Sequence, residues 1–77
     1  MIKSNKDISI KLAKFIKNQR LKKNLTQNEL ASISKIDYKH IQNLESLKKI
    51  NDPKLSTLQK LAFALEISVL DIINSIF

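Results

Sequence analysis

The chain has 77 residues, with 14 Lys or Arg against 7 Asp or Glu, and it contains no cysteine, one proline and no glycine. The absence of glycine excludes the phosphate-binding loops of nucleotide-dependent enzymes, because these loops need glycine where the backbone approaches the phosphates. Without thiols there is no disulfide scaffold or cysteine-based zinc module, and a single histidine, His40, is too few for a metal site or a triad. We therefore expect no enzymatic activity, no cofactor and no bound metal.

The length of the chain predicts a single domain over residues 1–77, with residues 1–7 as a flexible N-terminal arm. No apolar segment resembles a secretory signal or reaches the roughly 18 residues needed to cross a membrane. The sequence therefore predicts a cytoplasmic protein that does not interact with membranes.

The net charge of +7 is confined to the first third of the chain. Residues 1–24 contain eight of the basic residues and one of the acidic residues, whereas the charges of residues 25–77 cancel. A small basic domain of this kind typically binds a polyanion, and nucleic acid is the usual one.

The low content of helix-breaking residues and the absence of a strand-like alternation predict an all-α fold of five helices. The first helix is predicted over residues 8–23, with Ile8, Leu12, Phe15 and Ile16 on its inner face. It should end at Asn24, because asparagine tolerates the left-handed backbone conformation of a helix C-cap.

The next two helices are predicted over residues 27–34 and 38–47. Thr26 and Glu29 form a capping box for the second helix, which carries the apolar Leu30, Ala31 and Ile33. Asp37 is expected to cap the third helix, in which Ile41 and Leu44 face inward. The side chains expected to face outward are those of Tyr38, Lys39, Gln42 and Asn43.

A loop over residues 48–54 is predicted to precede the last two helices. The fourth helix places its apolar residues at helical spacing, at Leu55, Leu58, Leu61, Ala62 and Leu65. Ser68 and Asp71 form a second capping box at the start of the fifth helix. This last helix is expected to turn Val69, Ile72 and Ile76 toward the core.

Residues 26–45 have the features of a helix-turn-helix motif, with a small residue, Ala31, where the two helices would touch and apolar residues on both inner faces. The sequence resembles the lambda-repressor-like, Cro/C1-type (XRE) helix-turn-helix regulators of bacteria and phages over about residues 9–73. Its length and the pattern LASxSxIDxxxI also resemble the small controller proteins of restriction-modification systems. The matching residues are Ile16, Arg20, Leu25 to Gln27, Glu29 to Ala31, Ile41, Leu44, Glu45, Pro53, Leu58, Leu61, Ala62, Ala64 and Leu65.

The resemblance implies roles for individual residues in binding DNA. Residues 38–47 become the recognition helix in the major groove, and Arg20 and Glu45 become a structural ion pair between the first and third helices. The base contacts implied are those of Tyr38, Lys39, His40 and Asn43. The phosphate contacts implied are those of Thr26, Gln27, Gln42, Lys48, Lys49 and Lys54.

A single short helix reads too few base pairs to specify a site, so we expect a dimer on double-stranded DNA with two half-sites. Leu70, Ile73 and Phe77 form an outward apolar stripe that suits a homodimer interface. The alternative is an antitoxin-like protein-interaction module in which this stripe binds a partner protein and DNA binding is secondary. No small-molecule ligand is expected, and RNA binding is disfavoured because few aromatic residues are available to stack on bases.

Members of the family that the chain resembles often have glycine at four positions, which are occupied here by Asn24, Lys35, Leu47 and Glu66. Lys35 lies in the turn of the predicted motif. Either its φ is positive and strained, or the turn has a different structure.

Overall fold

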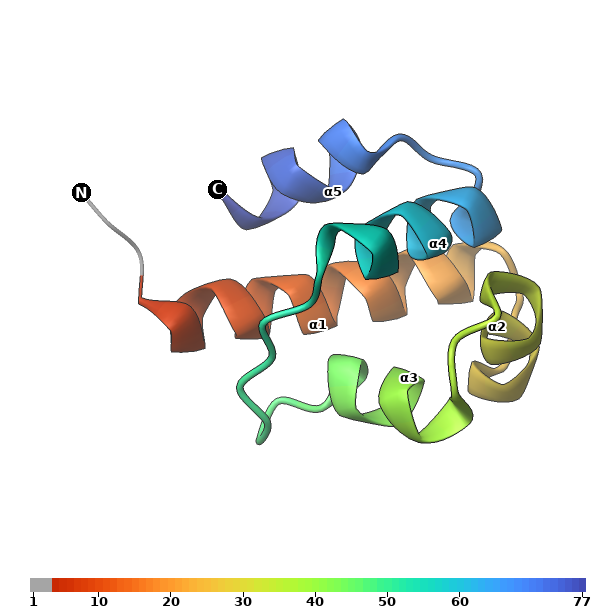
Figure 1. The fold of residues 1–77 in the computed structure, drawn as a ribbon, viewed down its shortest axis with the longest axis horizontal. Coiled ribbons are helices and arrows are strands. Elements are labelled where there is room, and N and C mark those ends of the chain that lie inside the picture. The colour runs from red at the N-terminus through yellow and green to blue at the C-terminus, as the bar shows by residue number, and fades with distance from the viewer. Residues whose placement is uncertain (1–3) are drawn as a thin grey trace.

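The computed structural model describes residues 4–77, which form five α-helices and no strand (Figure 1). The all-α prediction is therefore confirmed. The long first helix contacts α3 and α5, which lie on opposite sides of it, and α2 contacts both α3 and α4. The helices are α1 (Asn5–Lys22), α2 (Gln27–Ser34), α3 (Tyr38–Glu45), α4 (Leu55–Leu65) and α5 (Val69–Ile76).

All five helices contribute to one hydrophobic core. Its fully buried large side chains include Leu12, Ile16, Leu30, Ile41, Leu44, Leu61, Leu65 and Ile72. Leu55, one of the apolar residues counted in the helical spacing of the fourth helix, is the first residue of α4 and is 62% exposed. Ile33 is also exposed, since the buried residues of α2 are Leu30, Ala31 and Ser34.

The first helix begins at Asn5, three residues before the predicted start. The Ser4 side chain accepts a hydrogen bond from the Asp7 backbone N–H at 3.1 Å and so caps the helix. Residues 5–7 therefore belong to α1 and not to a flexible arm, and the rest of the predicted arm, residues 1–3, lies outside the described residues.

The third helix ends at Glu45, so the prediction that it extends to Leu47 is wrong. Ser46 is extended, with ψ of 132°, and its Oγ accepts a hydrogen bond from the Lys48 backbone N–H at 3.1 Å. A serine that bonds the backbone two residues ahead competes with continuation of a helix. At the other end, Asp37 occupies the N-cap position as expected, but its side chain makes no capping hydrogen bond.

Three of the four family glycine positions have left-handed backbone conformations without glycine. The φ angles of Asn24, Lys35 and Glu66 are 57°, 59° and 58°, whereas Leu47 is not among the residues with positive φ. At each of these three helix ends, the residue that follows the left-handed one donates its backbone N–H to a carbonyl five residues earlier. The bonds run from Leu25 to Arg20, from Ile36 to Ala31 and from Ile67 to Ala62. This is the pattern of a Schellman cap, in which the residue after the left-handed one packs on the helix.

Candidate nucleic-acid interface

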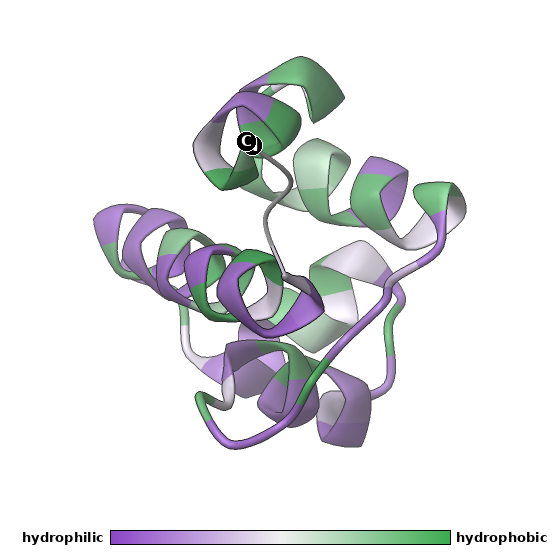
Figure 2. Ribbon diagram, turned by 90° about the vertical axis from the view of Figure 1, so that its left-hand side faces the viewer, coloured by the Kyte–Doolittle hydropathy of each residue, from purple (hydrophilic) through white to green (hydrophobic). Residues whose placement is uncertain are grey.

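The second and third helices are joined by residues 35–37 and form a helix-turn-helix unit at one edge of the molecule (Figure 1). The unit is held on α1, and its outer edge, with the loop after α3, is largely hydrophilic (Figure 2). A polar α3 on a rigid support is the arrangement needed for a helix that enters a DNA groove.

An ion pair between Arg20 of α1 and Glu45 of α3 lies at the centre of this support. Nε of Arg20 donates to Oε2 of Glu45 at 2.7 Å, and Nη2 donates to Oε1 at 2.9 Å. The third donor, Nη1, binds the Leu25 carbonyl at 2.8 Å, in the turn between α1 and α2. The two charged side chains are only 9% and 3% exposed, so their hydrogen bonds are well shielded from water.

The pKa of Arg20 is raised from its ordinary value. Its hydrogen bond to Glu45 is the main cause, burial opposes the shift, and the Glu45 charge adds to it. Arg20 therefore carries its positive charge at neutral pH, where it faces the Glu45 carboxylate.

Gln27, the first residue of α2, is connected to the same ion pair. Its Nε2 donates to Oε1 of Glu45 at 3.1 Å, and the residue is half-buried. The preceding Thr26 forms the expected capping box, in which its Oγ1 accepts from the Glu29 N–H and its own N–H donates to the Glu29 carboxylate. The two expected phosphate-binding residues of α2 thus lie at a helix N-terminus, where the first backbone N–H groups favour an anion.

The first turn of α3 presents its side chains to solvent. Tyr38, Lys39 and His40 are all exposed, whereas Asn43, one turn later, is half-buried. Nε2 of Gln42 donates to the Tyr38 hydroxyl at 3.1 Å, which leaves the phenolic O–H free to donate elsewhere. The four expected base-contacting residues therefore lie on one helix, and three of them are exposed.

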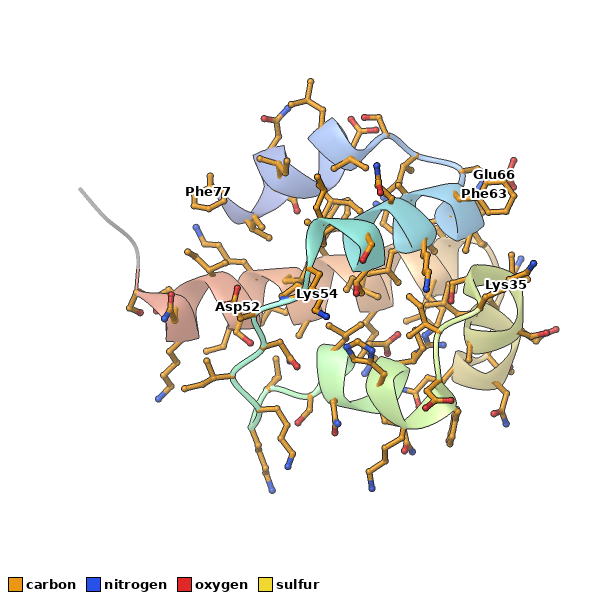
Figure 3. All side chains as sticks on the ribbon, in the orientation of Figure 1. Lys35, Asp52, Lys54, Phe63, Glu66 and Phe77 are labelled. Atoms are coloured by element: carbon orange, nitrogen blue, oxygen red, sulfur yellow. The ribbon has the colours of Figure 1, made fainter. Side chains whose placement is uncertain are left out.

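The three lysines expected to contact phosphates after α3 are exposed and lie in residues 46–54. Lys48 and Lys49 occupy the first part of this segment, and Lys54 is the N-cap residue of α4. Figure 3 shows Asp52 and Lys54 on the loop that leads into α4.

Two polar residues that the sequence interpretation missed hold this loop. The Ser9 hydroxyl donates to the Lys49 carbonyl at 3.0 Å and accepts from the Asn51 N–H at 2.8 Å. Nδ2 of Asn51 donates to the Asn43 carbonyl at 2.8 Å. A signal for Ser9 was available, because it is a polar residue at an inner-face position, three, four and seven residues before the buried Leu12, Ala13 and Ile16.

Part of the basic charge of α1 lies next to α3. Lys14 and Lys17 line a hollow of about 330 Å³ together with Glu45 and Leu47, at the end of α3. The charge excess of the N-terminal third thus reaches the same edge of the molecule as the helix-turn-helix unit.

A separate apolar surface lies on α5. Leu70 and Phe77 are 63% and 71% exposed, and Ile73 between them is half-buried, so the expected outward stripe is only partly exposed. Ile73 and Phe77 also line a groove of about 390 Å³ with Ile8 and Leu58. In Figure 2 the hydrophobic residues of α5 stand out at the edge away from α3.

Among residues 4–77 there is no group of three or more His, Cys, Asp or Glu side chains that could hold a metal ion. Within the same range, no helix combines the length and the apolar character needed to cross a membrane.

The fold and the arrangement of α2 and α3 define a helix-turn-helix domain of the lambda-repressor-like type. A model of the helix-turn-helix family matches residues 16–72, and the chain belongs to this family, the Cro/C1-type (XRE) helix-turn-helix proteins. It is therefore a DNA-binding helix-turn-helix regulator. No curated protein matches the chain.

Proposed function

We propose that the protein is a sequence-specific regulator of transcription that binds DNA as a dimer, with α3 in the major groove of each half-site. The observation that carries the proposal is the exposed first turn of α3 on a helix whose opposite face is fixed by buried Ile41 and Leu44 and by the Arg20–Glu45 ion pair. A helix held in this way presents its side chains to base edges at a defined depth and angle.

The base-reading roles follow from the chemistry of the α3 side chains. The Asn43 amide suits a bidentate contact with adenine, and Lys39 suits the O6 and N7 acceptors of guanine. The Tyr38 hydroxyl is free to donate to a base or a phosphate, and His40 is exposed in the same turn of α3. Half-buried Asn43 is the most constrained of the four, and we assign it the largest share of specificity.

The phosphate-binding roles fall on residues around α3. Thr26 and Gln27 contact the backbone from the N-terminus of α2, and Gln42 does so from α3 itself. Lys48, Lys49 and Lys54 supply charge from the loop, and Lys14 and Lys17 supply it from α1. These contacts give affinity that falls steeply with salt and carries no sequence information.

The dimer interface proposed is the apolar surface of Leu70, Ile73 and Phe77. This proposal is supported by the position of Ile73 and Phe77, which belong both to this surface and to the adjoining groove. A second copy bound here would bury the exposed side chains and fill the groove. A self-complementary apolar patch of this kind suits two-fold symmetry, which matches DNA with two half-sites. Such a regulator acts in the cytoplasm.

The test is selection of binding sites from random DNA, followed by anisotropy titration of the selected site and a scrambled one. Asn43→Ala and Lys39→Ala are expected to weaken binding to the selected site by about 1 to 3 kcal/mol while weakening the scrambled site less. Lys60→Ala, on α4 outside the proposed DNA-binding surface, is the matched control. Equal binding of all three variants to the selected site contradicts a reading role for α3.

An antitoxin-like interaction module is the second candidate, favoured by the large exposed fraction of Leu70 and Phe77. In that case the α5 surface binds a different protein. Light scattering during gel filtration separates the two proposals, since a monomer at micromolar concentration favours the interaction module. A methyltransferase or toxin gene beside this one would identify the regulated system.

A further inference from the structure

The buried hydroxyl of Ser9 connects α1 to the backbone of the loop that follows α3. Ser9 is 1% exposed, and its single hydroxyl both donates to the Lys49 carbonyl and accepts from the Asn51 N–H. A serine hydroxyl offers one donor and two acceptor sites, so both loop groups are satisfied by one side chain. Buried polar groups that are paired in this way are costly to leave unpaired.

Asn51 extends this connection from α1 to α3. Its N–H is bound by Ser9, and its Nδ2 donates to the Asn43 carbonyl near the end of α3. The Asn43 carbonyl also accepts from the Ser46 N–H at 3.2 Å, so the last turn of α3 and the loop share one acceptor. We call the three bonds that join Ser9, Lys49, Asn51 and Asn43 the loop-anchoring hydrogen bonds.

The two lysines of the loop lie between two fixed points. The Lys48 N–H is bound by Ser46 Oγ, and the Lys49 carbonyl is bound by Ser9, while both side chains remain exposed. The backbone is therefore restrained on either side of the positive charges, and only the flexible side chains remain to be ordered on binding. A binding group held in place before the ligand arrives loses less conformational freedom in the complex.

We propose that Ser9 is a positioning residue for DNA binding, which acts through the loop-anchoring hydrogen bonds to hold Lys48 and Lys49 where they meet the phosphate backbone. This inference rests on the proposed function. Because the lysines contact phosphates, the effect of Ser9 is the same on every DNA sequence. Ser9→Ala is expected to weaken binding to selected and scrambled DNA alike, by about tenfold each.

The decisive experiment compares Ser9→Ala in two backgrounds by anisotropy titration at several salt concentrations. In the wild type it is expected to lower affinity and to reduce the slope of log affinity against log salt by about 1 to 2. In the Lys48→Ala/Lys49→Ala background it is expected to have no further effect, because the groups it positions are gone. An equal loss in both backgrounds overturns the proposal, since Ser9 would then act on the whole fold. Ser34→Ala is the matched control, because within residues 4–77 this buried hydroxyl bonds only to Ala31 of its own helix.

A second measurement needs no DNA. Trypsin cleaves after lysine, and Ser9→Ala is expected to speed cleavage after Lys48 and Lys49 by about tenfold in the free protein, with cleavage after Lys22 unchanged. Equal acceleration at all sites indicates global destabilisation and overturns the proposal. If the wild type binds no DNA, the proposed function fails, and faster cleavage at the loop alone shows that Ser9 still restrains it.

Discussion

Gln27 Nε2 and Arg20 Nη2 donate to the same oxygen of Glu45, Oε1, at 3.1 Å and 2.9 Å. Since Arg20 lies on α1, Gln27 on α2 and Glu45 on α3, one carboxylate joins the three helices that present the candidate DNA-binding surface. Beside the apolar contacts of Ile41 and Leu44, the polar support of α3 is thus concentrated in one buried carboxylate.

Removing Arg20 is expected to destabilise the protein strongly. Arg20→Met leaves the Glu45 carboxylate buried without its charged partner, and the free energy of unfolding in urea should fall by about 3 to 5 kcal/mol. The double variant Arg20→Met/Glu45→Met should recover much of this loss. The control is Lys23→Met, which breaks the exposed 3.5 Å pair with Glu66 and should cost less than about 1 kcal/mol. If Arg20→Met and Lys23→Met lowered the free energy of unfolding by similar amounts, burial of the Arg20–Glu45 pair would have no effect on stability.

Gln27→Ala is expected to weaken DNA binding without changing which sequence is preferred. Gln27 is oriented by Glu45 at the start of α2, and its removal takes away one phosphate contact, which corresponds to about 1 kcal/mol. Anisotropy titration of selected and scrambled DNA checks this, with Asn28→Ala at the neighbouring exposed position as the control. A change confined to the selected site would assign Gln27 to base reading instead.

Lys35→Gly is expected to leave the protein as stable as the wild type or more stable, by up to about 1 kcal/mol. At φ of 59° a lysine is strained, whereas glycine adopts this conformation freely, and this relief offsets the greater freedom that glycine gives the unfolded chain. Ser32→Gly, inside α2, is the control and should destabilise by about 0.5 kcal/mol. Thermal unfolding measures both, and equal destabilisation would mean that Lys35 carries no strain.

Leu70→Gln and Phe77→Ser are each expected to convert the proposed dimer to a monomer, because they remove apolar area from the α5 surface. Phe63→Ser is a matched control. Phe63 is 77% exposed, but it lies at the other end of the molecule from Phe77 (Figure 3). Sedimentation equilibrium gives the association state of each variant. If only Phe63→Ser produced a monomer, the dimer interface would lie on α4 and not on α5.

Local patterns in the sequence predicted most of the fold. The spacing of Leu58, Leu61 and Leu65 and the capping boxes of α2 and α5 gave the correct helices, because these signals involve residues close in the chain. The same kind of signal, Ser4 followed by Asp7, also marked the true start of α1 and was overlooked. The choice at Lys35 stayed open, because only tertiary packing decides whether a turn accepts a strained residue.

The candidate site was predictable where the motif is local and not where it depends on distant residues. The outward residues of α3 followed from its periodicity, but the connection from Ser9 to Asn51 spans 42 positions and leaves no local pattern. The early end of α3 at Glu45 coincides with a side-chain hydrogen bond of Ser46 that competes with the helix, a competition that residue preferences alone do not resolve.

The burial pattern of α3 has an evolutionary consequence. Its core contacts are made by Ile41 and Leu44, while Tyr38, Lys39 and His40 are exposed and lie outside the core. Substitutions at these three positions leave Ile41 and Leu44 in place, so under the proposed function the target sequence can change while the core of the domain is kept.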